Sequence, residues 1–190
     1  MLRDLRTATR MFLLLSVLTG VLYPGLVTVT ARLAFPGQST GSIVRVDGKA
    51  VGSRFIGQAF SAPRYFWGRP SATGPMPGNG AASSGSNVGP SNPALVAAAA
   101  ARIATLRAAD PGNTHPVPVD LVTASASGLD PEISIAAAEF QVPRVARARG
   151  LAEDRVRQLM REATYDRTFG VLGEPRVNVL ELNLALDRGR

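Results

Sequence analysis

The sequence predicts an α+β protein, with one N-terminal transmembrane helix followed by a single extracytoplasmic α+β domain. Three observations support this prediction. Residues 11–31 contain no charge, and as a helix they would extend about 32 Å, which matches the hydrocarbon core of a bilayer. The remainder alternates between Gly- and Pro-rich loops, helix-forming runs and short strand-like segments. A length of 190 residues accommodates one anchor and one domain of ordinary size.

The apolar segment divides the chain into a cytoplasmic tail (1–10), a transmembrane helix (11–34) and an extracytoplasmic domain (35–190). A cleaved secretory signal is the alternative, because basic residues precede the segment and small residues end it at Ala31. The segment is longer than the apolar core of an ordinary signal, which favours a retained anchor. Arginines flank both ends, so the charge rule leaves orientation nearly tied, and a short basic tail in the cytoplasm is the simpler arrangement.

Small residues recur every fourth position along the apolar segment, at Ser16, Gly20, Pro24 and Thr28. Such a stripe allows a neighbouring membrane helix to approach closely. The alternative is that Gly and Pro are simply commoner in membrane helices. We therefore expect packing against partner helices at Ser16, Gly20 and Pro24, with this second explanation left open.

Composition argues against several kinds of site. The chain has no cysteine and a single histidine, His115, so we expect neither disulfides nor a metal site. The net charge is +7, but the arginines between Arg144 and Arg161 alternate with acidic residues. This pattern favours a solvated helix face, and we expect no nucleic-acid partner.

The first half of the domain contains a hairpin signal, an aromatic cluster and a long loop. Asp47-Gly48 between alternating apolar residues is typical of a type I′ turn. The aromatic run 55–67 predicts packing core, with a binding surface as the less favoured alternative. Residues 71–92 are mostly Gly, Pro, Ser and Asn, which predicts a Gly/Pro/Ser-rich loop. This loop contains no basic residue and hence no Walker lysine.

The second half predicts mainly helices. Asn92-Pro93 is a strong helix start, and the helix should end at Asp110. We expect the following elements after it: a strand at 120–124, a capped helix start at Asp130-Pro131-Glu132, a break at Pro143, a helix end at Gly150 and a helix over 154–165. The alternating leucines of 180–186 favour a strand, although their composition also suits a helix.

The candidate contact residues lie in the long loop. If the loop is ordered, its backbone groups need partners, so Gly85, Ser86, Asn87 and Asn92 are candidates for docking on another subunit. The carboxylates Asp120, Asp130 and Glu139 are scattered along the sequence, and none forms a recognisable acid–base pair. A tethered binding module and a serine-dependent hydrolase remain as alternatives, the latter needing a base beside a loop serine.

Long motifs in a fixed order give the chain a specific resemblance. They are YPGLVT, VGSRFIGQAF, YFWGRPSAT, SSGSNVGPSNP, DLVTASASGLDPEIS, QVPRVARARG and LGEPRVNVLELNLALD. From Tyr23 to Asp187, the chain resembles the C subunit of the bacterial Kdp-type potassium-transporting ATPase. One departure is Ser84, where the family more often has glycine.

The resemblance implies an accessory, non-catalytic subunit of a high-affinity, ATP-driven potassium importer in the bacterial inner membrane. Its implied partners are a P-type ATPase subunit, a channel-like potassium-binding subunit and a small hydrophobic subunit. In one account of the family, the subunit is a catalytic chaperone that raises ATP affinity in a ternary complex with ATP, which makes Gln141 a candidate nucleotide contact. In the other account, the domain caps the potassium entrance and stabilises assembly. A domain outside the membrane does not meet cytoplasmic ATP, so topology favours capping.

Overall fold

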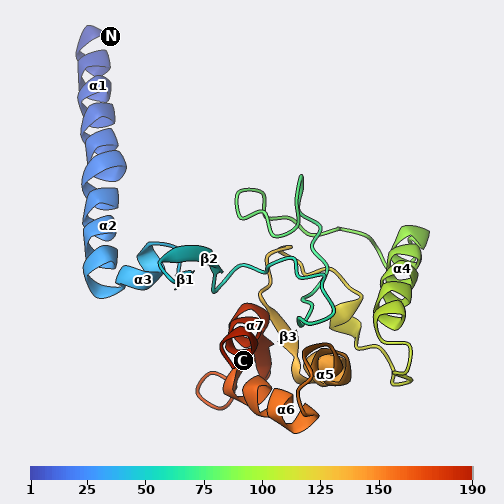
Figure 1. The fold of residues 1–190 in the computed structure, drawn as a ribbon. Coiled ribbons are helices and arrows are strands. Elements are labelled where there is room, and N and C mark those ends of the chain that lie inside the picture. Colours follow the sequence, from blue (N-terminus) through green and yellow to red (C-terminus); the bar gives the residue numbers. More distant parts are fainter. Residues whose placement is uncertain (190) are drawn as a thin grey trace. The chain divides into compact units, whose positions relative to one another are not determined.

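The computed structural model describes residues 1–189, which fall into two compact units, Met1–Val44 and a second unit beginning at Arg45. In the first unit, α1 (Leu2–Val17), a π-helical turn η1 (Leu18–Leu22) and α2 (Tyr23–Ala34) form one helical run (Figure 1). The short helix α3 (Pro36–Ser39) follows. The helix thus begins nine residues before the apolar segment, at Leu2.

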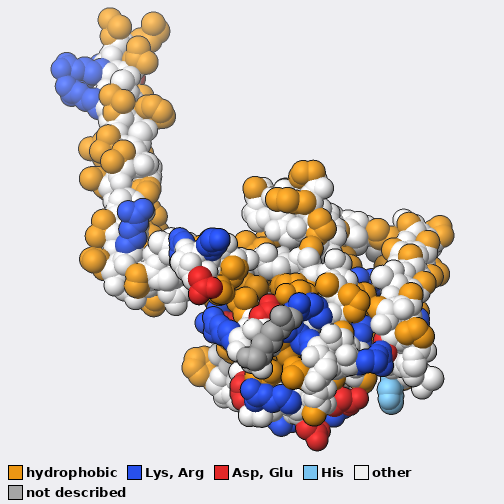
Figure 2. Space-filling model, in the orientation of Figure 1, with side chains coloured by type: hydrophobic (Ala, Val, Ile, Leu, Met, Phe, Trp, Pro, Cys, Tyr) orange, Lys and Arg blue, Asp and Glu red, His pale blue; other side chains and the backbone are white. Residues whose placement is uncertain are grey.

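The helical run Leu2–Ala34 is the one helix among residues 1–189 that is long and apolar enough to cross a membrane, with a mean hydropathy of 2.0 in its most apolar window. None of its residues is buried within the structure. Hydrophobic side chains project from it in Figure 2. Apolar side chains exposed over such a length are stable in lipid, which is consistent with a membrane anchor.

The predicted hairpin is confirmed. Strands β1 (Ile43–Val46) and β2 (Lys49–Ser53) pair around Asp47 and Gly48. Both turn residues have positive φ, 49° and 77° respectively, as a type I′ turn requires.

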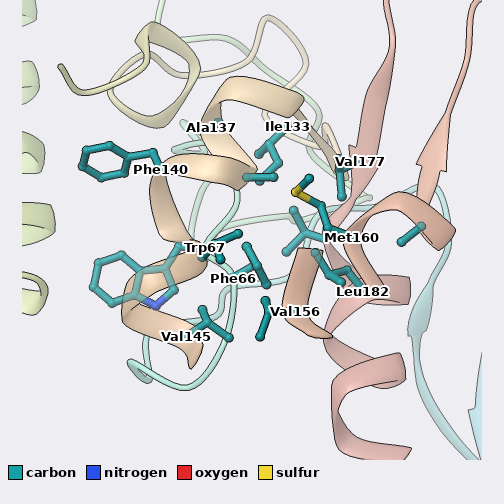
Figure 3. Packing of buried hydrophobic residues seen from close by; sticks show 14 of the residues in the cluster. Phe66, Trp67, Ile133, Ala137, Phe140, Val145, Val156, Met160, Val177 and Leu182 are labelled. Carbon is teal, nitrogen blue, oxygen red and sulfur yellow. The ribbon is translucent and has the colours of Figure 1, made fainter. Parts of the chain in front are cut away.

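The second sheet holds the centre of the domain. Its strand order is β3 (Glu132–Ser134), β5 (Arg176–Asn178) and β4 (Thr164–Tyr165), with both pairs antiparallel. Helices α5 (Ile135–Arg149), α6 (Glu153–Glu162) and α7 (Val179–Arg188) pack with it around one apolar core. Phe66 and Trp67 enter this core from the aromatic run, and Figure 3 shows Phe66 among Val145, Val156 and Leu182. The aromatic run therefore packs in the core at its end, whereas Phe55 at its start is exposed.

Helix α4 (Pro93–Ala109) begins at Asn92, as predicted, because the Asn92 side chain accepts a hydrogen bond from Ala94 N at 2.9 Å. A single-turn 3₁₀ helix, η2 (Val119–Leu121), follows. The strand expected at 120–124 is wrong. Asp120 instead turns back and accepts hydrogen bonds from Ser134 N (2.7 Å) and Ser134 Oγ (3.2 Å).

Three further helix boundaries differ from expectation. The helix expected to start at Asp130-Pro131-Glu132 begins at Ile135, because Glu132–Ser134 pairs with β5 and Ser134 caps the helix. Pro143 does not break α5, which continues to Arg149 and ends at Gly150 with φ 66°. Helix α6 ends at Glu162, and Tyr165 belongs to β4.

The strand favoured for the C-terminal segment is also wrong. Asn178, the last residue of β5, caps α7 by accepting a hydrogen bond from Glu181 N at 3.1 Å. The buried residues of α7 fall at helical spacing (Val179, Leu180, Leu182, Asn183, Leu186). The alternating leucines therefore belong to a helix, although their spacing also fits a strand.

Candidate functional site

The loop 71–92 has no helix or strand in the described structure, and its first part is held by two hydroxyl groups. Ser71 Oγ donates to Gly128 O at 2.6 Å and accepts from Gly78 N at 3.0 Å. Thr73 Oγ1 donates to Met76 O at 2.8 Å and accepts from Asn79 N at 3.1 Å. The loop is therefore ordered by side-chain hydrogen bonds in place of regular structure.

The next part of the loop lies against residues 126–128. Ser84 N and Ser83 Oγ both donate to Ser127 O at 3.0 Å. A Cβ at Gly85 would lie 2.7 Å from Ala126 O, closer than any side chain tolerates. Gly85 is therefore required for the close approach of two backbones, a structural role in addition to the docking role predicted for it from the sequence.

The other loop candidates separate into two kinds. Asn92 is committed to capping α4. Ser86 and Asn87 are exposed, and neither side chain forms a hydrogen bond within residues 1–189. Asn87 has φ 49°, a conformation that Asn tolerates better than most residues. Of the four candidates, Ser86 and Asn87 are thus the two with side chains free to contact another protein, and their docking role stays a prediction.

Helix α4 adds a surface that the sequence reading missed. Its 17 residues include just one that is buried, Leu106. Its two charged residues, Arg102 and Arg107, lie over the rings of Trp67 and Phe140. Val96 is 66% exposed and Ile103 38% exposed on the remaining surface, which is otherwise mostly alanine. We call the exposed part of α4, represented by Val96, Ala97, Ala100, Ile103 and Ala104, the outer face.

A helix that is apolar all round is normally covered by other protein or by lipid. The sequence signal was present in the run ALVAAAAARIATLRAA, which has no polar face. Figure 2 shows hydrophobic side chains along this helix at the edge of the domain. The outer face of α4 is therefore a candidate contact surface.

Gln141 lies in the interior, 1% exposed, on α5. Its Oε1 accepts from Trp67 N (2.8 Å), and its Nε2 donates to Trp67 O (3.1 Å) and Ala137 O (3.1 Å). Every polar group of the amide is thus occupied. In this conformation Gln141 joins the aromatic segment to α5, and its nucleotide contact stays a prediction.

Arg144 completes this buried polar cluster. Its guanidinium donates to Gln141 Oε1 at 2.6 Å and to Tyr65 O at 3.0 Å, and it lies 4.4 Å from the Trp67 ring centroid. Burial lowers the pKa of Arg144 to about 10, so it stays charged at neutral pH. The solvated arginine face expected from the sequence is therefore wrong for Arg144, and also for Arg149, whose side chain is buried against Arg64 O and Leu186 O.

The scattered carboxylates have separate partners. Asp130 pairs with Arg69 at 2.9 Å and accepts from Glu132 N at 3.0 Å, whereas Glu139 pairs with Arg157. No group of three or more His, Asp or Glu residues among residues 1–189 could hold a metal ion. His115 is exposed in its loop. Asp130 and Glu139 are thus each engaged in an ion pair with an arginine that stabilises local structure.

The membrane-helix candidates Ser16, Gly20 and Pro24 lie around the π-helical turn, and all are exposed. No atom within the structure would meet a Cβ at Gly20. The surface is thus open along this part of the helix, and packing against a partner helix stays a prediction.

Comparison with known proteins identifies the family to which this chain is related. Residues 5–188 match the family described as K+-transporting ATPase, c chain. The chain is similar to proteins named potassium-transporting ATPase KdpC subunit. It is 64% identical to the one from Herpetosiphon aurantiacus, covering 96% of this chain and 95% of the relative. It is 61% identical to that of Sorangium cellulosum, over 100% of both chains. The chain therefore belongs to the KdpC family of subunits of the K+-transporting ATPase.

Proposed function

We propose that this subunit is a non-catalytic, accessory component that stabilises assembly of the ATPase and caps the potassium entrance of a channel-like partner. The helix Leu2–Ala34 would hold it in the bacterial inner membrane, with its N-terminus in the cytoplasm and its domain outside. The observation that supports this role is the outer face of α4, an uncharged surface along a helix with a single buried residue.

The loop supports the same role. It leads directly into α4, and its exposed residues Ser86 and Asn87 precede the helix by a few residues. A polar tip beside an apolar helix face resembles the usual composition of a protein interface, with an apolar centre and a polar rim. The partners in this proposal are the P-type ATPase subunit, the channel-like subunit and the small hydrophobic subunit.

The chaperone role makes a different demand on the structure. For Gln141 to contact ATP, its amide would have to release the backbone of Trp67 and the guanidinium of Arg144, all of which are buried. Docking through α4 requires no such rearrangement. We therefore give docking as the primary function.

The test places a charge on the outer face. Val96→Asp, in the whole complex, should reduce co-purification of the large membrane subunits at least tenfold, because a buried unpaired carboxylate opposes association. Ser86→Ala combined with Asn87→Gly should give a smaller reduction, since Gly keeps the positive φ while the polar side chain is lost.

The matched control is Val171→Asp, which changes a valine that is 71% exposed in a turn outside α4. It should leave co-purification unchanged. Equal losses for Val96→Asp and Val171→Asp, or no loss for either, would contradict docking through α4. Circular dichroism of each variant chain in detergent checks that the domain is folded.

A further inference from the structure

A pocket of about 190 Å³ lies in the domain between the start of the loop, α4 and the segment 125–131. Its wall contains three charged residues, Arg69, Arg102 and Asp130. Asp130 already pairs with Arg69 at 2.9 Å. Among these residues, Arg102 is therefore the charge without a carboxylate partner.

Arg102 is held in place by neutral groups. Its Nε donates to Leu121 O at 3.0 Å and its Nη2 to Gly68 O at 3.1 Å, while Nη1 forms no hydrogen bond within residues 1–189. The guanidinium also lies 5.4 Å from the Trp67 ring centroid. Two carbonyls and the Trp67 ring thus hold the Arg102 guanidinium in place, while the N–H groups of Nη1 remain available to donate hydrogen bonds.

The surroundings increase the positive character of the pocket. Arg144, which contacts the same Trp67 ring, forms no ion pair within the described residues either. Arg69 Nε is buried without a hydrogen-bond partner in residues 1–189, so this wall also holds an unpaired donor on a second arginine. A partly buried cation without a counter-charge favours an anion nearby.

We propose that this pocket binds an oxyanion, a carboxylate or a phosphate group, through Arg102. The volume suits an acidic side chain or a small anion and is below the range of pockets that enclose larger ligands. Arg102 would use its free Nη1 for the anion while its other nitrogens keep the carbonyl contacts. The occupant has two possible sources: an Asp or Glu side chain from a neighbouring subunit, or a free anion.

Trp67 provides the signal for a direct test, because it is the single tryptophan of the chain and lies beside Arg102. The full chain in detergent is titrated with acetate, succinate and inorganic phosphate against chloride at constant ionic strength. At least one of these oxyanions should give a saturable change in tryptophan fluorescence that chloride does not. Arg102→Gln should weaken that binding at least tenfold, and Arg102→Lys should recover part of it.

A second variant keeps the test valid if Arg102→Gln does not fold. Gly68 lines the pocket, has no positive φ, and a Cβ there would meet no atom within 4 Å. Gly68→Leu should therefore fold normally and still weaken anion binding at least tenfold. Arg155→Gln is the matched control, because Arg155 is exposed, does not line the pocket, and forms a side-chain hydrogen bond only to Gln158 within residues 1–189; its anion binding should equal wild type.

Calorimetry on the assembled complex then distinguishes the sources. Absence of the Arg102-dependent heat in the complex means that a subunit's carboxylate already fills the pocket, whereas its presence means that the ligand is a free anion. Either result supports the site. No saturable response to any of the three oxyanions, or an unchanged response in both Arg102→Gln and Gly68→Leu, would overturn it.

Discussion

The domain contains two regions whose side chains are used differently. In α7, five of ten residues are buried: Val179, Leu180, Leu182, Asn183 and Leu186. In α4, one of 17 is buried, Leu106. We call α5, α6, α7, their sheet and Phe66–Trp67 the framework, and the loop 71–92 with α4 the projecting region. The contrast indicates that the framework provides folding stability, while the projecting region has exposed apolar and polar surface that can contact another protein.

The largest expected effect comes from comparing the stability loss caused by one truncation in each region. Phe66→Ala should reduce the free energy of unfolding by about 3–5 kcal/mol, because Phe66 is fully buried in the core. Val96→Ala, on the exposed face of α4, should change it by less than about 0.5 kcal/mol. Urea unfolding of the full chain in detergent measures both. Similar losses for the two variants would show that the projecting region shares in the core.

The next prediction concerns the polar part of the framework. Gln141→Leu keeps the volume but leaves Trp67 N and Trp67 O without partners. We expect a loss of about 2–4 kcal/mol, since each unsatisfied buried group costs about 1–3 kcal/mol. Gln158→Leu, at an exposed site on α6, is the control and should be nearly neutral. Unchanged stability in Gln141→Leu would remove Gln141 from the framework and strengthen its assignment as a nucleotide contact.

The smallest effect concerns the edge of the framework and depends on pH. Burial alone would raise the pKa of Asp187, but hydrogen bonds from Arg149, Tyr65 and Arg64 outweigh it and lower that pKa below its ordinary value. The stabilisation is thus complete above the unfolded pKa of about 3.9 and is lost as pH falls through the lower, folded pKa.

Asp187→Asn should therefore reduce stability at pH 7 by at most about 1 kcal/mol, because the site is partly exposed. The difference from wild type should shrink as the pH falls below about 4. Thermal melting of both chains between pH 7 and the acid limit of folding measures this change. A constant difference across the range would show that the carboxylate's charge contributes nothing.

Local signals in the sequence predicted local structure well. Asp47-Gly48 specifies its hairpin through positive φ, Asn92-Pro93 starts α4, and Gly150 ends α5. In each case the determining atoms lie within a few residues of one another. The apolar segment likewise predicted a helix because its length and composition alone meet the requirement of a bilayer.

The failures arise where distant residues decide. Glu132–Ser134 is a strand only because Arg176–Asn178 pairs with it. The alternating leucines of α7 predicted a strand, although Asn178 with Glu181 three residues later is a recognisable signal for the start of a helix. Arg144 was predicted to be solvated because its hydrogen-bond acceptors, including Tyr65 O, come from a segment far away in sequence.

The candidate site was predicted in part. The loop was identified from composition, but Gly85 and Asn92 serve its internal structure, while Ser86 and Asn87 stay free. The outer face of α4 went unrecognised because its alanines were read only as helix formers. Which side of a uniformly apolar helix is left uncovered depends on where Leu106 packs, and this requires the tertiary structure.

One turn of the anchor has a geometric consequence for any helix beside it. Tyr23 N bonds to Leu18 O, five residues back, so this turn contains one residue more than its neighbours. Each residue of an α-helix advances by about 100°, so everything from Tyr23 onward is rotated by about that angle from an uninterrupted spiral. Deleting a single residue within Leu18–Leu22 would remove the extra residue and leave α2 facing the same side, whereas refolding this turn as regular α-helix without a deletion would rotate α2 by about that angle and present a different side to the surrounding lipid or protein. Side-chain substitutions that keep the turn would leave that phase intact.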